Sequence, residues 1–367
     1  MNETLTTSRL MTPAPPAELG FDAAALAAAT VFAEANETPW PRDLTEALGG
    51  GPLGPEPYDK LLGPVAPRGG PNGLVLRRGR VAATWGDVER ADFTFSVAKS
   101  YLAVLAGLAV ADGLIRDVHD PVRDYALDDG FEAAQNRDIT WHHLLQQTSE
   151  WEGTLFDRPD LVDRNRDVGH DGDNSAKGQH RDLQPPGSFW EYNDVRVNRL
   201  SLSLLQVFRR PLPEVLRERI MGPIGAGDSW AWHGYDNATV EIDGQPMVSV
   251  PGGTHWGGGI EINSVDHARL GQLILQEGAW EGRVLLPAAW CRQMLTPCAV
   301  KPVYGYLWWL NTDRAYRPDA PAASVFASGA GGNIIWVDPS LDLVVVARWL
   351  DPARHDDFVG QIVASLK

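Results

Sequence analysis

The feature that most constrains the fold is an almost unbroken apolar run at residues 101–110, which directly follows the tetrapeptide Ser96-Val97-Ala98-Lys99. Its alanines and leucines favour helix, and the lack of a polar face predicts a helix that is buried on most sides. Ser96 and Lys99 form an S-x-x-K pattern in the first turn, where residues three apart share a helix face.

A lysine at the start of a buried helix is costly as an ion. Its amine is therefore a candidate base, and a base beside a serine makes the hydroxyl nucleophilic. The alternative is structural: Ser96 caps the helix and Lys99 extends to solvent.

Composition limits the class of protein. The 367 residues are 44% hydrophobic, which suffices for a large core in one elaborate domain or two lobes. A net charge of -16, with no cluster of Lys and Arg, argues against nucleic acid or an anionic membrane surface as partner.

Residues 1–16 do not resemble a signal peptide, and no apolar run could span a bilayer, so we expect a cytoplasmic protein. The two cysteines, Cys291 and Cys298, are expected to be reduced thiols.

Secondary-structure signals change along the chain from strand to helix and back to strand. A β-hairpin is expected around the turn Arg78-Gly79, and strands rich in Val, Ile, Trp and Tyr return near the end. The expected helices cover residues 21–35, 141–148, 195–207, 213–221, 264–277 (with Ser264 as N-cap) and 358–366, and the expected strands cover residues 73–77, 80–85, 304–310, 324–327, 333–337 and 343–349.

This order predicts an α+β fold in which an antiparallel sheet is built from both termini and flanked by helices. Residues 1–94 and 298–367 would form the sheet lobe. Residues 95–297 would form an inserted, mainly helical lobe, with the active site at the junction of the two.

Two further segments carry chemistry that a reactive serine needs. In residues 186–194, Tyr192 follows a Pro-Gly turn and directly precedes a predicted helix. A phenol near an ammonium group ionises more readily. Residues 326–332 end a predicted strand in a glycine-rich turn, where backbone can approach a ligand closely. Taken alone, the first segment is more typical of a packed tyrosine, and the second is equally typical of an ordinary hairpin turn.

The three segments, in this order, resemble the serine β-lactamase and penicillin-binding-protein superfamily. The likeness is greatest to its class C β-lactamase-like branch, which includes family VIII carboxylesterases and 6-aminohexanoate-dimer hydrolases. It extends from residue 73 to the last helix and includes residues 139–149 and 257–266. The resemblance implies that Ser96 forms an acyl-enzyme, that Lys99 helps to deprotonate it, and that Tyr192 relays the proton.

The resemblance also implies how the oxyanion is held. The backbone N–H groups of Ser96 and Ala330 would donate to it, and Ser328 and Gly329 would border the substrate site. No metal and no cofactor is required by this chemistry.

Two positions depart from the superfamily pattern. The Tyr-x-Asn triplet ends in Asp194, and the Lys/His-Thr/Ser-Gly triplet reads Ala327-Ser328-Gly329. The cation that usually faces a substrate carboxylate is therefore missing, and Asp194 would repel a carboxylate if it faced the pocket. Both changes argue against a penicillinase or a DD-peptidase and favour neutral or cationic substrates.

Several aromatic residues and one histidine are further candidates for substrate contact. Trp151, Trp190 and Trp256 can line an apolar acyl pocket, although each is also explained by core packing. His255 lies in a glycine-rich stretch and can contact substrate or be a satisfied structural histidine. No pair of histidines has the spacing of zinc ligands.

The sequence therefore predicts a serine hydrolase that cleaves small ester or amide substrates through an acyl-enzyme. Two alternatives stay open. One is a non-catalytic ligand-binding or sensor protein on the same fold, which the altered third triplet suggests. The other is an acyltransferase, which differs only in the nucleophile that resolves the acyl-enzyme. The expected partner is a small-molecule substrate, and homo-oligomerisation is left open.

Overall fold

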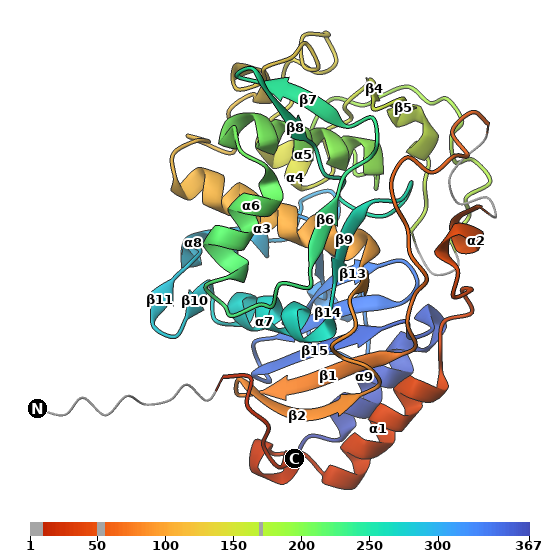
Figure 1. Cartoon of the computed structure of the whole chain (residues 1–367), viewed down its shortest axis with the longest axis vertical. Helices are drawn as coiled ribbons and strands as arrows, with labels where there is room; N and C mark the ends of the chain where they lie inside the picture. Colours follow the sequence, from red (N-terminus) through yellow and green to blue (C-terminus); the bar gives the residue numbers. More distant parts are fainter. Residues whose placement is uncertain (1–9, 50–55, 169–171) are drawn as a thin grey trace, which may run out of the picture.

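The computed structural model describes residues 10–49, 56–168 and 172–367. At its centre lies helix α3 (Ala98–Ala111), in which every residue from Ala98 to Ala109 is buried. It contacts α5 (Asp194–Phe208), α6 (Leu212–Leu216) and α8 (Ala288–Met294). The prediction of a helix buried on most sides is confirmed, because the buried residues of α3 lie on every face of the helix, and Figure 1 shows it among α5, α6 and α8.

A six-stranded antiparallel sheet joins the two ends of the chain. Its strand order is β12-β13-β14-β15-β1-β2. The strands are β1 (Asn72–Arg77), β2 (Arg80–Trp85), β12 (Trp309–Leu310), β13 (Val325–Gly329), β14 (Asn333–Asp338) and β15 (Leu343–Arg348). The predicted hairpin at Arg78-Gly79 and the predicted α+β fold are confirmed, whereas the proposed boundaries between two lobes stay a prediction.

Helices cover both faces of this sheet, which explains why the interiors of its strands β1, β14 and β15 are apolar on both faces. Val75 and Val345 face one cluster with α1 (Ala23–Ala35) and α9 (His355–Ala364). Their neighbours along the strands point to the opposite face, which α7 (Ser264–Leu275) covers. Figure 1 shows α1 and α9 on one side of the sheet and α7 on the other. Helix α7 therefore packs on the sheet, although its place in the sequence assigns it to the helical lobe.

A buried arginine links this sheet to a smaller one. Arg348, the last residue of β15, donates to the carbonyl oxygens of Asp92 at 3.0 Å, Phe93 at 2.9 Å and Ile262 at 2.9 Å. These acceptors belong to β3 (Asp92–Phe93) and β9 (Gly259–Ile262), and β9 pairs with β3 on one side and with β6 (Ala231–His233) on the other. The bonds fix the strand that directly precedes Ser96.

The sequence analysis missed the short strands in the middle of the chain. Elements of two to four residues are too short to show an alternating pattern. Besides β3, β6 and β9, they are β4 (Thr154–Leu155), β5 (Arg158–Pro159), β7 (Thr239–Ile242), β8 (Gln245–Val248), β10 (Ala279–Trp280) and β11 (Arg283–Val284). The remaining helices are α2 (Leu44–Gly49), α4 (Trp141–Leu145) and the single turns η1 (Pro16–Leu19), η2 (Phe95–Val97), η3 (Val122–Asp124), η4 (Asp160–Asp163), η5 (Arg217–Met221), η6 (Thr312–Arg314) and η7 (Pro352–Arg354).

Two local predictions were wrong in detail. The N-cap of α7 is Asn263, whose side chain accepts from Asp266 N at 2.7 Å, so Ser264 is the first helical residue. The strand expected at 304–310 shortens to β12, because Leu307 takes a positive φ of 57° and turns the chain.

Cys291 and Cys298 are free and buried, as expected. Within the described residues, none of the helices has both the length and the apolar character needed to cross a membrane.

Gly107 in α3 offers a test of how tightly the central helix is packed. An added Cβ would lie 2.3 Å from the Trp290 ring of α8. Overpacking typically costs about 1–3 kcal/mol, whereas the better helix propensity of alanine gains at most about 1 kcal/mol. We therefore expect Gly107→Ala to lower the free energy of unfolding, measured by urea denaturation. Gly49→Ala is the matched control, because no atom from elsewhere in the described residues lies within 4 Å of its added Cβ. A Gly107→Ala protein as stable as the control would contradict this packing argument.

Candidate active site

Ser96 lies in η2, directly before α3, and is partly exposed while the residues on either side of it are buried. Lys99 Nζ lies 2.9 Å from Ser96 Oγ, as the spacing of the S-x-x-K pattern predicted. Phe95 has a positive φ of 52°, a conformation that costs energy for an aromatic residue. Edge-on contacts with the rings of Trp40 and Trp349 hold it there. These ring contacts therefore hold the strained backbone of Phe95 in place, directly before Ser96.

His267 of α7 contacts side chains on both sides of Ser96 in the sequence. Its Nε2 lies 2.8 Å from Thr94 Oγ1, and its Nδ1 lies 2.9 Å from Tyr101 Oη. Burial, with a smaller effect of nearby Arg348, holds the pKa of His267 well below its usual value. The ring is therefore neutral and offers one donor and one acceptor to the two hydroxyls.

Lys99 is buried with three polar partners. They are Ser96 Oγ, the Gly252 carbonyl oxygen at 3.3 Å, and the carboxylate of Asp194, which lies in direct hydrogen-bond contact. Burial opposes the charged form, but the charges of Asp194 and Tyr192 outweigh it, so the pKa of Lys99 is raised. The expectation that burial favours a free amine is therefore wrong for the resting side chain. It is an ammonium ion, because a carboxylate from a distant helix faces it.

Asp194 is the first residue of α5, where the side chain of Asn193 caps the helix by accepting from two backbone N–H groups. Its second carboxylate oxygen contacts Arg166 and lies 3.1 Å from His255 Nδ1. Burial alone would raise its pKa, but Lys99, Arg166 and His255 hold the pKa of Asp194 well below its usual range. Asp194 is only 3% exposed. It is therefore a neutralised carboxylate, and the repulsion of substrate carboxylates that we expected from it does not follow.

Arg166 comes from the long polar loop that follows η4, and a second ionic network holds this loop in place. Fully buried Glu150 accepts from Arg181 twice and from Arg196 once, each at 2.6 Å. Arg164 in the same loop pairs with Asp160 at 2.8 Å. Paired, buried charges of this kind fix the loop and so deliver Arg166 to Asp194.

Three potential metal ligands come together at this point. Ligand atoms of Asp163, Asp194 and His255 all lie within 4.8 Å of one another. Both carboxylates already face cations, since Arg166 contacts the two of them and Lys177 Nζ lies 3.3 Å from Asp163 Oδ1. A metal ion would have to displace these side chains, so the geometry favours an ion-pair cluster over a metal centre.

Tyr192 is buried beside Lys99 and forms part of an aromatic wall. Lys99 Nζ lies 4.8 Å from the centre of its ring, and the ring stacks on Trp309 at 6.0 Å. Trp309 stacks in turn on Tyr316 at 4.9 Å, and Tyr316 Oη lies 2.9 Å from Ser328 Oγ. Sequence reasoning named Tyr192 and Ser328 but missed Trp309 and Tyr316. The dense aromatic residues from 304 to 316 were the available signal.

Trp190 and Tyr304 complete this wall. The Trp190 ring lies 5.3 Å from Tyr304 and 5.9 Å from Trp309, so one of the three predicted tryptophans does join the site. The other two are buried. Trp151 is buried and donates from Nε1 to the Gly130 carbonyl oxygen at 2.7 Å. Trp256 is fully buried against His255, with ring centres 4.2 Å apart. Their contacts support core packing.

The end of β13 lies directly against Ser96. A Cβ on Gly329 would lie 2.3 Å from the Thr94 carbonyl oxygen and 3.1 Å from Ser96 N, so this approach requires glycine. Ala330 is the next residue and is exposed. An oxyanion hole formed by the N–H groups of Ser96 and Ala330 would need the end of β13 to lie this close to Ser96. The role of these two N–H groups stays a prediction.

The glycine-rich segment 252–259 closes the site from another side. A Cβ on Gly253 would lie 3.4 Å from Ser96 Oγ and 3.2 Å from Lys99 Nζ. The same segment carries His255, which reaches Asp194 rather than open solvent, with its side chain 8% exposed. Sequence reasoning named His255 but did not identify its partner.

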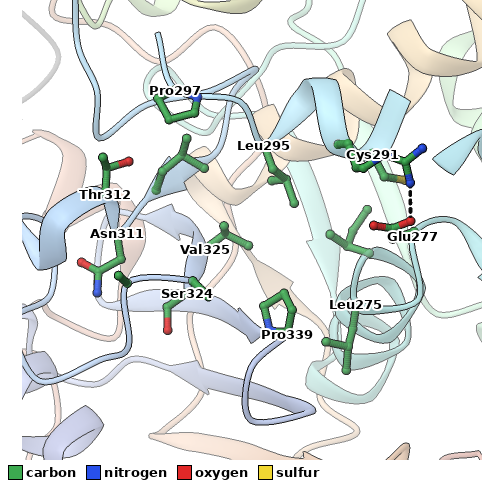
Figure 2. A pocket seen from close by; sticks show the side chains of 15 residues that line it. Leu275, Glu277, Cys291, Leu295, Pro297, Asn311, Thr312, Ser324, Val325 and Pro339 are labelled. Carbon is green, nitrogen blue, oxygen red and sulfur yellow. Dashed lines mark hydrogen bonds and ion pairs between the residues drawn. The ribbon is translucent and has the colours of Figure 1, made fainter. Parts of the chain in front are cut away.

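A cavity of about 400 Å³ lies elsewhere, between α7, α8 and the strands β12 and β13 (Figure 2). Leu310 and Val325, which pair across these two strands, both line it. Trp309, the neighbour of Leu310, points to the opposite face and stacks on Tyr192. The cavity and the Ser96 site are therefore on different faces of the same strand pair.

This fold, with a partly exposed serine and a lysine at the start of a buried helix, defines a protein of the serine β-lactamase and penicillin-binding-protein superfamily. The model of the Beta-lactamase family matches residues 93–349, and the chain belongs to that family. No curated protein matched the chain.

Solved structures with this fold are similar over most of the chain. EstCE1, "a hydrolase with promiscuous acyltransferase activity", is 17% identical with a TM-score of 0.59, over 94% of this chain and 98% of that one. A family VIII carboxylesterase is 16% identical with a TM-score of 0.57, over 81% and 92%. The octameric penicillin-binding protein homologue from Pyrococcus abyssi is 16% identical with a TM-score of 0.56, over 83% and 73%.

The ionic network that anchors the loop has a testable pH dependence. Burial would raise the pKa of Glu150, but Arg181 and Arg196 lower it below its usual value of 4.5. A lowered pKa stabilises the fold above the unfolded value, and this contribution disappears as the pH falls through the folded value. We expect Glu150→Gln to lower the free energy of unfolding at neutral pH by about 3–5 kcal/mol, and the difference from wild type to shrink below pH 4.5.

Urea denaturation at neutral and acidic pH checks this prediction. Asp243→Asn, which breaks the exposed pair with Arg209, is the control and should cost less than about 1 kcal/mol. A Glu150→Gln difference that stays constant as the pH falls would show that the charge of Glu150 is not what matters.

Proposed function

We propose that this protein is a serine hydrolase that cleaves small esters or amides through an acyl-enzyme on Ser96. The observation that carries the proposal is the 2.9 Å contact between Lys99 Nζ and the Oγ of a partly exposed serine. Such a pair, held at the start of a rigid buried helix, is the arrangement in which a serine becomes a nucleophile. The membership of the β-lactamase family supports the same class of chemistry.

The proposed reaction has two stages. Ser96 Oγ attacks the substrate carbonyl carbon while its proton passes to the free-amine form of Lys99. The oxyanion accepts from the N–H groups of Ser96 and Ala330, and the tetrahedral intermediate then loses the alcohol or amine. We assign Tyr192 Oη to protonate that leaving atom and to regain its proton from the Lys99 ammonium group, which restores the free amine. In the second stage water attacks the ester of Ser96, its proton passes through the same two groups to Ser96 Oγ, and the acid is released.

The surroundings of Ser96 favour neutral, partly apolar substrates. Ala327-Ser328-Gly329 contributes no cation, and the Tyr192, Trp309 and Tyr316 rings offer an apolar wall for an acyl group. The charges of Asp194 and Arg166 are paired with each other and do not select the sign of the substrate. The preference for neutral substrates therefore rests on the missing cation and the aromatic wall.

One alternative has a specific observation in its favour. EstCE1, which shares the fold over nearly its whole length, is a hydrolase with promiscuous acyltransferase activity. An aromatic wall beside Ser96 can shield an acyl-enzyme from water and admit an alcohol instead, so acyl transfer is the second candidate. A purely ligand-binding role is less favoured, because the Lys99–Ser96 contact has no use in binding alone. Homo-oligomerisation and a cytoplasmic location stay predictions.

Labelling with acylating probes tests the nucleophile. We expect a fluorophosphonate to add once to the wild-type protein, and a short-chain p-nitrophenyl ester to be turned over. Ser96→Ala should abolish both, because the attacking oxygen is gone, while intact mass and thermal unfolding show a folded, unlabelled protein. Ser100→Ala is the matched control, since Ser100 lies one turn further along α3 and donates to the Leu307 carbonyl oxygen.

A penicillin completes the probe set. A stable penicillin adduct, with no turnover of the ester, would place the protein with the penicillin-binding proteins instead of the esterases. Labelling that persists in Ser96→Ala would refute the assignment of the nucleophile.

A further inference from the structure

Asp194 occupies the position at which the superfamily pattern has asparagine, and it changes the electrostatics of Lys99. An asparagine there could hydrogen-bond to the lysine without carrying a charge. Asp194 instead places a full negative charge against Lys99 Nζ, with both side chains almost completely buried. Among the described residues, it is the only carboxylate that contacts Lys99.

The other charged or titratable groups around Lys99 come from three segments. The segment before α5 contributes Tyr192, the long loop contributes Arg166 and Asp163, and the glycine-rich segment contributes His255. Tyr192 acts with Asp194 to favour the ammonium form, whereas the positive charge of Arg166 disfavours it. Asp194 is thus shared between two cations, and Arg166 competes with Lys99 for the same carboxylate.

This arrangement has a direct chemical consequence. Only a free amine has the lone pair that can accept the proton of Ser96 Oγ, so an ammonium ion at position 99 cannot start acylation. We propose that Asp194 is a positioning counterion that keeps Lys99 protonated in the resting enzyme and confines rapid acylation of Ser96 to alkaline solution, with Arg166 opposing this effect. The inference rests on the proposed function, because it assumes that Lys99 serves Ser96.

Two substitutions should move the pH dependence in opposite directions. Asp194→Asn removes the counterion, so the free amine forms at lower pH. Arg166→Gln removes the competing cation, so Asp194 acts more strongly on Lys99 and the free amine forms only at higher pH. A merely structural role would make both variants slower without moving their profiles apart.

The measurement is the second-order rate of labelling by a fluorophosphonate, followed by intact mass across the neutral and alkaline range. In this reaction the bond from Ser96 Oγ to phosphorus forms, the phosphorus–fluorine bond breaks, fluoride leaves, and the serine proton passes to Lys99. We expect the rising limb of the wild-type profile to lie above neutral pH. Asp194→Asn should shift it to lower pH and raise the rate at neutral pH by about tenfold or more, since each pKa unit is a tenfold change in free amine.

Two controls identify the titrating group. Arg166→Lys keeps the positive charge and should restore a profile close to wild type. His255→Gln should leave the position of the limb near that of wild type, because the charge of Arg166 acts on Lys99 itself, whereas His255 only contacts Asp194. If His255→Gln instead abolished the limb, His255 would be the titrating group and the proposal would be overturned.

The remaining outcomes also decide the question. Profiles of Asp194→Asn and Arg166→Gln that coincide with wild type, or that shift in the same direction, refute the inference. If Asp194→Asn does not fold, the shift in Arg166→Gln and its rescue in Arg166→Lys still test the proposal. Wild-type protein that is not labelled at any pH would contradict the proposed function itself, which is a distinguishable result.

Discussion

The buried charge of Lys99 is the constraint on which the rest of the site depends. Helix α3 has no polar face, and its first turn is as deeply buried as its middle. An unpaired ammonium ion at that place would cost several kcal/mol, so the fold must bring a carboxylate to it. Asp194 meets this need from α5, and its own burial then requires Arg166. Each buried charge thus requires an oppositely charged partner. Together these ion pairs link α3 to α5 and to the long loop.

The same reasoning explains why the long loop needs an ionic network of its own. Arg166 stabilises Asp194 only if its backbone stays in place, and a polar loop has little apolar surface to anchor it. Glu150, fully buried, bonds at once to Arg181 in the loop and to Arg196 in α5. Because Arg196 lies two residues after Asp194, the anchor of the loop and the charge that it stabilises share one helix. A displacement of this helix would therefore affect the loop and the site together.

What could be predicted from the sequence was local. The apolar run predicted α3, the Arg78-Gly79 turn predicted the hairpin, and the spacing of the S-x-x-K pattern predicted the contact between Ser96 and Lys99. The resemblance correctly identified the superfamily from three ordered segments. The charge state of Lys99 could not be predicted in this way, because its partner lies 95 residues further along the chain. Trp309 and Tyr316 were missed for a similar reason, since the stacking of Trp309 between Tyr192 and Tyr316 depends on how β12 meets the segment before α5.

The features that break local rules all converge on Ser96. Phe95 adopts a backbone conformation that its side chain disfavours, Lys99 is a charge in a buried helix, and Gly329 lets a strand approach closer than any other residue would allow. None of these features would improve the stability of a simple packed core, and each must be compensated by neighbouring residues. Features that cost stability in this way are typical of functional sites, where the geometry that they impose serves the function. The strain at Phe95 lies directly before Ser96, Lys99 Nζ lies against the Ser96 hydroxyl, and Gly329 lets the end of β13 approach the same point. Their coincidence at one partly exposed serine supports the proposal that the chemistry takes place there, on grounds that are independent of family membership.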